Sequence, residues 1–289
     1  MDKQTHQVGY WGPVTATLDW CEANYQFSHY VAEMSNTFSN LFFVFISLYG
    51  ASLSLRQSLP ARYLIGFAGC ALVGLGSIFF HATLLYEAQL ADELPMIYAA
   101  SFLLAVLLES EPGFGFKSTY SKFLVAATIL FDIVFTASYF VYRDPVYHQS
   151  VFAALMLATL SREAYLLKWS EASRTIPDKK KATIVEVLRT GFLFFLFGFF
   201  IWNLDNIFCN SWTRIKQAVG WPTAFFMEGH AWWHVFTGLG TFYLNQGATC
   251  ATLSVKGDHH KYRIDYYYGL PLVMRTTSKP GAVKVKVKE

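Results

Sequence analysis

The sequence predicts an all-α membrane protein: a bundle of seven transmembrane helices with a lumenal N-terminus and a cytosolic C-terminus. Three observations lead to this prediction. Of the 289 residues, 54% are hydrophobic and only 15% are charged, whereas a soluble domain carries about 25% charged residues. The apolar residues form blocks as long as a spanning helix requires, about 20 residues. Lys and Arg gather in alternate loops between these blocks.

Each block is predicted to be a helix because backbone groups in hydrocarbon must be bonded within their own segment. The third and fifth blocks are the least uniform, since each contains a pair of charged residues. The predicted spans are 35–55, 63–84, 90–108, 123–142, 147–167, 185–208 and 223–243. The chain then divides into a lumenal segment (residues 1–34), a membrane domain (residues 35–246) and a basic cytosolic tail (residues 247–289).

The loops set the predicted orientation, because cytoplasmic loops carry an excess of Lys and Arg. The first 33 residues show no signal-peptide pattern, so the first span is the expected insertion signal. With the N-terminus lumenal, most basic residues fall in the inner loops and the tail. The outer side keeps Lys3, Arg143, Arg214 and Lys216.

The tail and the overall charge limit the expected partners. Val283, Val285 and Val287 alternate with lysines as in a strand, but a disordered tail near anionic lipid is the preferred interpretation. The net charge of +3 is small, and no basic stretch is interleaved with aromatic residues. We therefore expect membrane lipids as partners and no nucleic acid, and no obligate protein partner is evident.

The four cysteines allow one lasting disulfide under this topology. Cys70 falls inside the second span and Cys250 at the cytosolic end, whereas Cys21 and Cys209 both fall on the lumenal side. Only that side is oxidising enough to keep a bridge. We expect a Cys21–Cys209 disulfide, with two unpaired thiols as the alternative.

Polar and ionisable groups inside spans are costly and mark functional sites by default. Ser77 and His81 are four residues apart in the second span, as are His230 and His234 in the last span, so each pair lies on one helical face. With the predicted span directions, His81, Asp92 and the histidine pair all fall near the outer ends of their helices. Three imidazoles and a water are a common catalytic zinc set.

This set predicts hydrolytic chemistry. Zinc lowers the pKa of a water and polarises a carbonyl oxygen. Asp92 could accept the water proton or orient a ligand, and Ser77 could donate a hydrogen bond to a developing oxyanion. The soluble H-E-x-x-H pattern does not apply, because Ala231 stands where the glutamate would be. Hydrogen-bonded or interfacial histidines are the alternative, preferred for His29, His148, His259 and His260.

A second polar set precedes the first span. Calcium takes six to eight oxygen ligands, and several could come from Asp19, Glu22, Asn24 and Glu33. The spacing does not match an EF-hand, so from spacing alone a solvated acidic loop is preferred. A structural role, pairing between helices or capping, is preferred for Asp132, Arg162, Glu163, Arg189 and Asp205.

Several motifs taken together resemble the alkaline ceramidase family. They are Gly9–Pro13, Thr17–Glu22, Gly76–Ser77 with Phe80–His81, Asp92–Tyr98, Trp202–Asn203 with Asp205–Cys209, and His230–His234 with Thr237–Gly238. The similarity runs in order from about Gly9 to Gly240. The adiponectin-receptor group has a similar metal site, but its topology is inverted relative to the one predicted here.

The resemblance implies seven transmembrane helices and hydrolysis of the ceramide amide to a sphingoid base and a fatty acid, with ceramide taken from the bilayer. It implies that zinc lies on His81, His230 and His234, with Ser77 and Asp92 completing the site. It also implies an endoplasmic reticulum or Golgi membrane. Calcium would be bound by Asp19, Trp20, Glu22, Asn24 and Glu33, with Trp20 and Asn24 contributing backbone carbonyls.

Two other functions remain open at this stage. A seven-helix receptor or scaffold could hold zinc structurally, without turnover. A zinc transporter is less favoured, because the sequence shows no chain of polar ligands across the membrane depth. The preferred ceramide species is not indicated.

Overall fold

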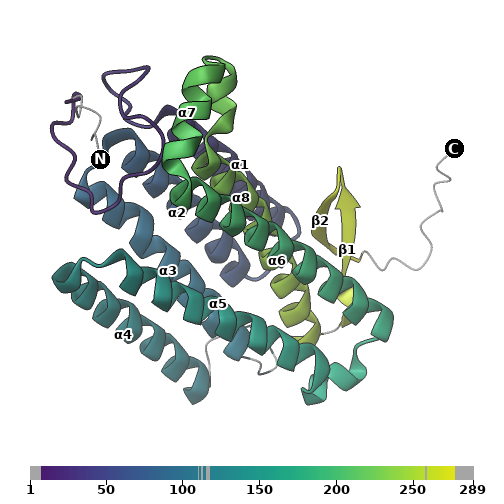
Figure 1. Cartoon of the computed structure of the whole chain (residues 1–289). Coiled ribbons are helices and arrows are strands. Elements are labelled where there is room, and N and C mark those ends of the chain that lie inside the picture. Colours follow the sequence, from purple (N-terminus) through teal and green to yellow (C-terminus); the bar gives the residue numbers. More distant parts are fainter. Residues whose placement is uncertain (1–7, 110, 112, 115–117, 258, 277–289) are drawn as a thin grey trace, which may run out of the picture.

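The computed structural model describes residues 8–109, 111, 113–114, 118–257 and 259–276. Long helices pack side by side and form an all-α membrane protein (Figure 1). Six described helices are long and apolar enough to cross a membrane. They are α1 (Met34–Arg56), α2 (Ala61–Thr83), α3 (Tyr86–Leu108), α4 (Thr119–Tyr142), α5 (Pro145–Lys168) and α6 (Asp178–Ile207).

A seventh long helix, α8 (Gly229–Lys256), packs against both α1 and α6. It begins later than the predicted last span, because residues 223–227 form a separate 3-10 turn after Pro222. It also ends later, at Lys256 instead of residue 243. Its second half is rich in small and polar residues that are buried, such as Asn245, Gln246 and Thr249. These side chains face other helices rather than lipid, so the helix extends well beyond its apolar stretch.

The tail predicted from residue 247 also differs from the structure. Residues 247–256 continue α8, and β1 (Tyr262–Tyr267) pairs with β2 (Leu270–Arg275) as an antiparallel hairpin. Val273 is fully buried, and its N–H donates to Gln246 Oε1 on α8 at 3.0 Å. Burial of the middle of β2, together with this bond to α8, therefore holds the hairpin in place. The alternating valines at 283–287 lie outside the described residues.

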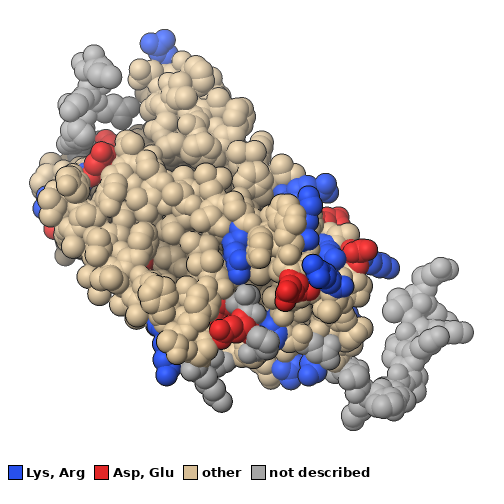
Figure 2. Space-filling model, turned by 90° about the horizontal axis from the view of Figure 1, so that it is seen from below, with Lys and Arg blue, Asp and Glu red and all other residues tan. Residues whose placement is uncertain are grey.

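The two ends of the bundle differ in character. The N-terminal segment and the short helix α7 (Cys209–Val219) lie at one end, which we call the outer end (Figure 1). Figure 2 shows Lys and Arg gathered toward the opposite, hairpin end, with a largely uncharged surface across the middle. At that inner end the Glu109 carboxylate binds Arg62 Nη1 and Lys256 Nζ, both at 2.6 Å, and all three side chains are buried.

Candidate metal centre and active site

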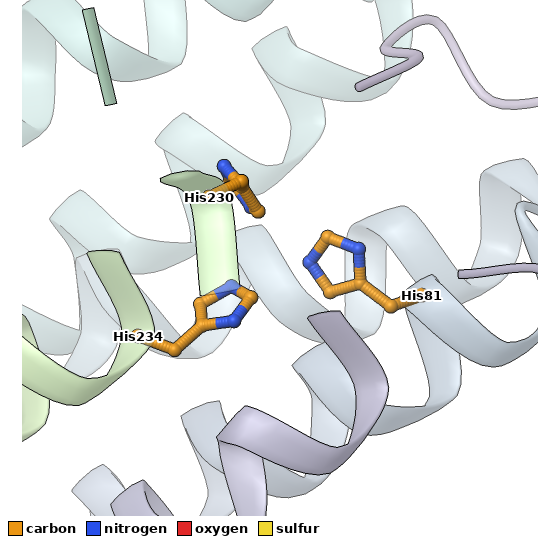
Figure 3. Close-up of side chains that lie close together, drawn as sticks. All are labelled: His81, His230 and His234. Carbon is orange, nitrogen blue, oxygen red and sulfur yellow. The ribbon is translucent and has the colours of Figure 1, made fainter. Parts of the chain in front are cut away.

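Three buried histidines converge near the outer end of the bundle (Figure 3). His81 comes from the last turn of α2, and His230 and His234 come from the start of α8. Their ring centroids are 4.6 to 5.0 Å apart, and one ring nitrogen of each lies within 4.8 Å of the others. Residues that are remote in the sequence thus form one compact set of nitrogen ligands.

The nitrogens of this cluster are suited to hold a metal ion. Nε2 of His81 and Nδ1 of His230 are buried and have no hydrogen-bond partner among the residues that the structure describes. A buried nitrogen without a partner costs about 1–3 kcal/mol, so two of them in one cluster fit the nitrogens of a metal site. Three histidines that leave one position open are the donor set of catalytic zinc sites.

Glu33 fixes the ring of His81. The Nδ1 atom of His81 lies 2.5 Å from Glu33 Oε2, and the two side chains are 1% and 0% exposed. A carboxylate partner on one ring nitrogen directs the other nitrogen to the metal. The structure therefore places Glu33, expected in the calcium set, in direct contact with a histidine of the metal cluster.

Ser77 and Asp92 come together because α2 and α3 touch at their backbones. A Cβ at Gly76 would overlap the carbonyl oxygen of Ala91, so only glycine permits this approach. This approach brings the adjacent residues, Ser77 on α2 and Asp92 on α3, next to each other. Asp92 is half-buried and Ser77 is 3% exposed. Ser77 lies on α2 one helical turn before His81, and Asp92 lies on the neighbouring helix α3.

The start of α8 is held by the end of α6. Asp205 Oδ1 accepts the backbone N–H of Gly229 at 3.2 Å, one residue before His230. A carboxylate at a helix N-terminus satisfies otherwise unpaired N–H groups and stabilises the helix dipole. Asp205 was expected to cap α6 or to bind the outer loop; instead it caps α8 and so positions His230.

The N-terminal segment covers the metal cluster from the outer side. The Trp20 ring stacks on the His230 ring, with centroids 4.0 Å apart and planes 19° from parallel. The neighbouring Cys21 is bridged to Cys209 at the start of α7, with a Cα–Cα distance of 5.5 Å. Lys216 Nζ on α7 donates to Cys21 O at 3.0 Å and to Glu228 Oε2 at 2.6 Å. These contacts anchor Trp20 over the histidines.

The proposed calcium ligands occupy the same segment but serve other partners in the structure. Both Glu22 carboxylate oxygens accept backbone N–H groups at the start of α1, from Ser35 at 2.7 Å and Asn36 at 2.9 Å. Asn24 Nδ2 donates to Asp19 Oδ1 at 3.2 Å. Within the described part of the chain, the carboxylates of this set do not converge as the three histidines do.

Two buried carboxyls of this segment have raised pKa values, and neighbouring carboxyls contribute to both rises. Burial raises the pKa of Glu22 to about 7, and the charge of Glu33 adds to that rise. Burial also raises the pKa of Glu33 to about 8, helped by the charge of Asp19. Buried oxygens of Glu33 (Oε1) and Asn24 (Oδ1) find no hydrogen-bond partner among the residues described here. A bound cation would stabilise the ionised forms of these carboxyls.

The other polar residues noted in the spans lie outside the cluster. Asp132 accepts a hydrogen bond from Ser101 at 2.9 Å, and Arg162 Nε donates to the backbone oxygen of Leu107 at 3.2 Å. His148 contacts the backbone oxygen of Glu93 at 2.9 Å. Polar contacts from Asp132 and Arg162 tie neighbouring helices together, as expected for structural residues.

Comparison with known proteins adds to this geometry. The ceramidase family model matches residues 12–274. The chain belongs to the ceramidase family. It is 37% identical over 238 residues to alkaline ceramidase 3 of Mus musculus, covering 81% of this chain and 83% of that protein. Alkaline ceramidase YPC1 of Saccharomyces cerevisiae is 32% identical over 245 residues, covering 81% and 76%.

A third relative, an alkaline ceramidase of Arabidopsis thaliana, is 31% identical over 265 residues and covers 91% of this chain and 94% of its own length. Membership in the family makes this chain a ceramidase, an enzyme that hydrolyses an amide. The matched region includes every residue of the histidine cluster and the Ser77–Asp92 pair.

Proposed function

We propose that this ceramidase is an intramembrane zinc hydrolase that cleaves the amide bond of ceramide taken from the bilayer, releasing a sphingoid base and a fatty acid. The observation that carries the proposal is the cluster of three buried histidines with unpaired nitrogens, together with Ser77 one turn before His81 and Asp92 on the adjoining helix. The relatives named above are alkaline ceramidases. A purely structural zinc site, as in a receptor or scaffold, would not need that pair.

The residues divide the chemistry between them. Zinc held by His81, His230 and His234 would supply a Lewis acid that lowers the pKa of a water and polarises the amide carbonyl. Asp92 accepts the proton of the attacking water as its oxygen bonds to the carbonyl carbon. Ser77 donates its hydroxyl proton in a hydrogen bond to the carbonyl oxygen. As the C–N bond breaks, Asp92 returns the proton to the leaving amine.

We extend the proposal to calcium in the N-terminal segment. Asp19, Glu22, Asn24 and Glu33 would supply oxygens, together with the backbone carbonyl of Trp20. The unpaired oxygens of Glu33 and Asn24 support this assignment, as do the raised pKa values of Glu22 and Glu33. Binding would need Glu22 to share oxygens that now cap α1.

The membrane arrangement completes the proposal. Helices α1–α6 and α8 would be the seven spans, with the N-terminus lumenal, the C-terminus cytosolic and the protein in the endoplasmic reticulum or Golgi membrane. The basic hairpin end in Figure 2 would face the cytosol. The histidine cluster would then lie in the outer half of the bilayer, where a ceramide amide lies near the lipid–water boundary.

The first experiment measures fatty-acid release from ceramide and bound zinc in purified wild-type protein, His230→Ala and His29→Ala. His29 is exposed and outside the cluster, so its variant is the matched control. We expect His230→Ala to lose turnover and zinc together, while His29→Ala keeps both. Substantial turnover in His230→Ala would overturn the site assignment. Bound zinc without release from any ceramide would favour the receptor or scaffold.

A further inference from the structure

A buried amide on α1 lies between Ser77 and the metal cluster. Asn40 is 0% exposed, and its Nδ2 atom is 3.0 Å from Ser77 Oγ and 3.1 Å from His234 Nδ1. No part of the mechanism above uses this residue. Burying an amide without hydrogen bonds costs free energy. The hydrogen bonds of Asn40 therefore show what the residue does in the site.

The orientation of the amide follows from a third contact. The Nδ2 atom also lies 3.0 Å from the backbone oxygen of Asn36, one helical turn earlier. A carbonyl oxygen only accepts hydrogen bonds, so the nitrogen of the amide, and not its oxygen, must face it. An NH2 group carries two hydrogens. One is donated to Asn36, and the other is directed to Ser77 Oγ.

The hydrogen-bond partner of His234 Nδ1 is the neighbouring Ser39 rather than Asn40. Ser39 Oγ lies 2.8 Å from His234 Nδ1, and its hydroxyl donates to the backbone oxygen of Asn36 at 2.9 Å. When Nε2 of a histidine binds a metal, Nδ1 carries the proton and donates it. The Asn40 nitrogen cannot accept that proton, whereas Ser39 Oγ can. Ser39 and Asn40 therefore have different partners: Ser39 receives from His234, and Asn40 donates to Ser77.

The donation from Asn40 restricts the hydroxyl of Ser77. Because Ser77 Oγ already accepts a proton from α1, its own O–H points away from α1, and the adjoining helix on that side carries Asp92. We propose that Asn40 is a positioning residue that keeps the Ser77 hydroxyl proton turned away from α1 and available to the reacting carbonyl. This inference rests on the proposed function, in which Ser77 donates to the carbonyl oxygen.

The test is a double-mutant cycle on purified full-length protein with Asn40→Leu, Ser77→Ala and the double variant, measuring kcat, KM and zinc content. Loss of one oriented hydrogen bond should lower kcat about tenfold in Asn40→Leu. KM and zinc content should stay within about twofold of the wild type. Ser77→Ala should lower kcat by about 10²–10³-fold. The double variant should be no slower than Ser77→Ala, because residue 40 then has no hydroxyl to hold.

A matched control separates this role from simple loss of a buried amide. Asn245 on α8 is also buried, and its Nδ2 donates to the backbone oxygen of Thr241, one turn earlier, at 2.9 Å. Asn245→Leu should leave kcat unchanged. Should Asn40→Leu fold poorly, Asn40→Asp keeps the shape of the side chain and replaces the donor with an acceptor. It should lose at least as much turnover as the leucine variant.

The outcomes separate this inference from the proposed function. One outcome is that the wild type hydrolyses ceramide and the losses of kcat in Asn40→Leu and Ser77→Ala add up in the double variant. That outcome would overturn the role of Asn40 but not the zinc hydrolase. Loss of zinc in parallel with kcat in Asn40→Leu would also overturn it, because the residue would then support the metal ligands. A wild-type protein that binds zinc and releases no fatty acid would overturn both.

Discussion

Two buried polar clusters, one at each end of the bundle, are built in opposite ways. At the inner end, Glu109 accepts from Arg62 and Lys256 at 2.6 Å, and Ser121 Oγ donates to its second oxygen at 3.1 Å. At the outer end, nitrogens of His81 and His230 remain without a hydrogen-bond partner among the described residues. The first cluster is complete without a ligand and joins helices. The second leaves ring nitrogens free of partners in the described part of the chain, as the ligands of a metal ion must be.

The strongest way to test this contrast is to remove the base of the outer cluster. Asp92→Asn should lower kcat by about 10²–10⁴-fold, because the amide cannot accept the water proton. Zinc content should be unchanged, since the histidines are intact. The measurement is fatty-acid release together with metal analysis. Asp132→Asn is the matched control, because Asp132 contacts Ser101 away from the cluster; equal losses in both variants would remove Asp92 from the mechanism.

A substitution in the inner cluster should lower the stability of the protein rather than its turnover of ceramide. Glu109→Gln leaves the buried cations of Arg62 and Lys256 without their carboxylate. Breaking a buried ion pair by removing one partner costs about 3–5 kcal/mol. We expect a lower melting temperature in detergent, with kcat per folded molecule unchanged. A normal melting temperature would show that solvent or lipid compensates these charges.

Glu33 should affect the metal more than the fold. Glu33→Gln replaces the carboxylate that accepts from His81 Nδ1 with a neutral amide, which weakens the hold on the ring. Loss of such a partner typically costs about 10–100-fold in metal affinity. Zinc release to a competing chelator would measure this. An unchanged affinity would mean that ring packing alone fixes His81.

The smallest expected effect is the pH dependence of the inner cluster. Burial raises the pKa of Glu109, but hydrogen bonds from Lys256 and Arg62 lower it more, so its pKa lies below the ordinary 4.5. A carboxyl with a depressed folded-state pKa stabilises the fold above its unfolded pKa and loses that contribution as the pH falls. Between pH 7 and pH 3, wild type should therefore lose more thermal stability than Glu109→Gln. Parallel curves would contradict this.

Helix positions and the main site residues could be predicted because they leave local patterns. Long apolar blocks mark α1–α6, and four-residue spacing places Ser77 with His81 and His230 with His234. Depth along each predicted helix then placed all of them near Asp92. The role of Gly76 could not be predicted from the sequence, because its close approach to α3 depends on how the two helices pack.

Contacts between distant segments could not be predicted in the same way. Glu33 binds His81 across 48 positions, and Asp205 binds Gly229 across 24; no periodicity in the sequence connects such pairs. Hydropathy predicts a tail for the second half of α8 because it assumes that a helix faces lipid. The hairpin has no local signal, because its stabilising partner is Gln246 on α8 rather than its own turn.

The order of the ligands along the chain has a consequence for biosynthesis. His81 is made early, whereas His230 and His234 follow near the end, and the Cys21–Cys209 bridge also joins the first segment to the last. A chain synthesised only as far as α7 therefore lacks two of the three histidines of the cluster, however well its first helices are inserted. Under the proposed zinc site, metal retention therefore requires α2 and α8 to have been made and packed together.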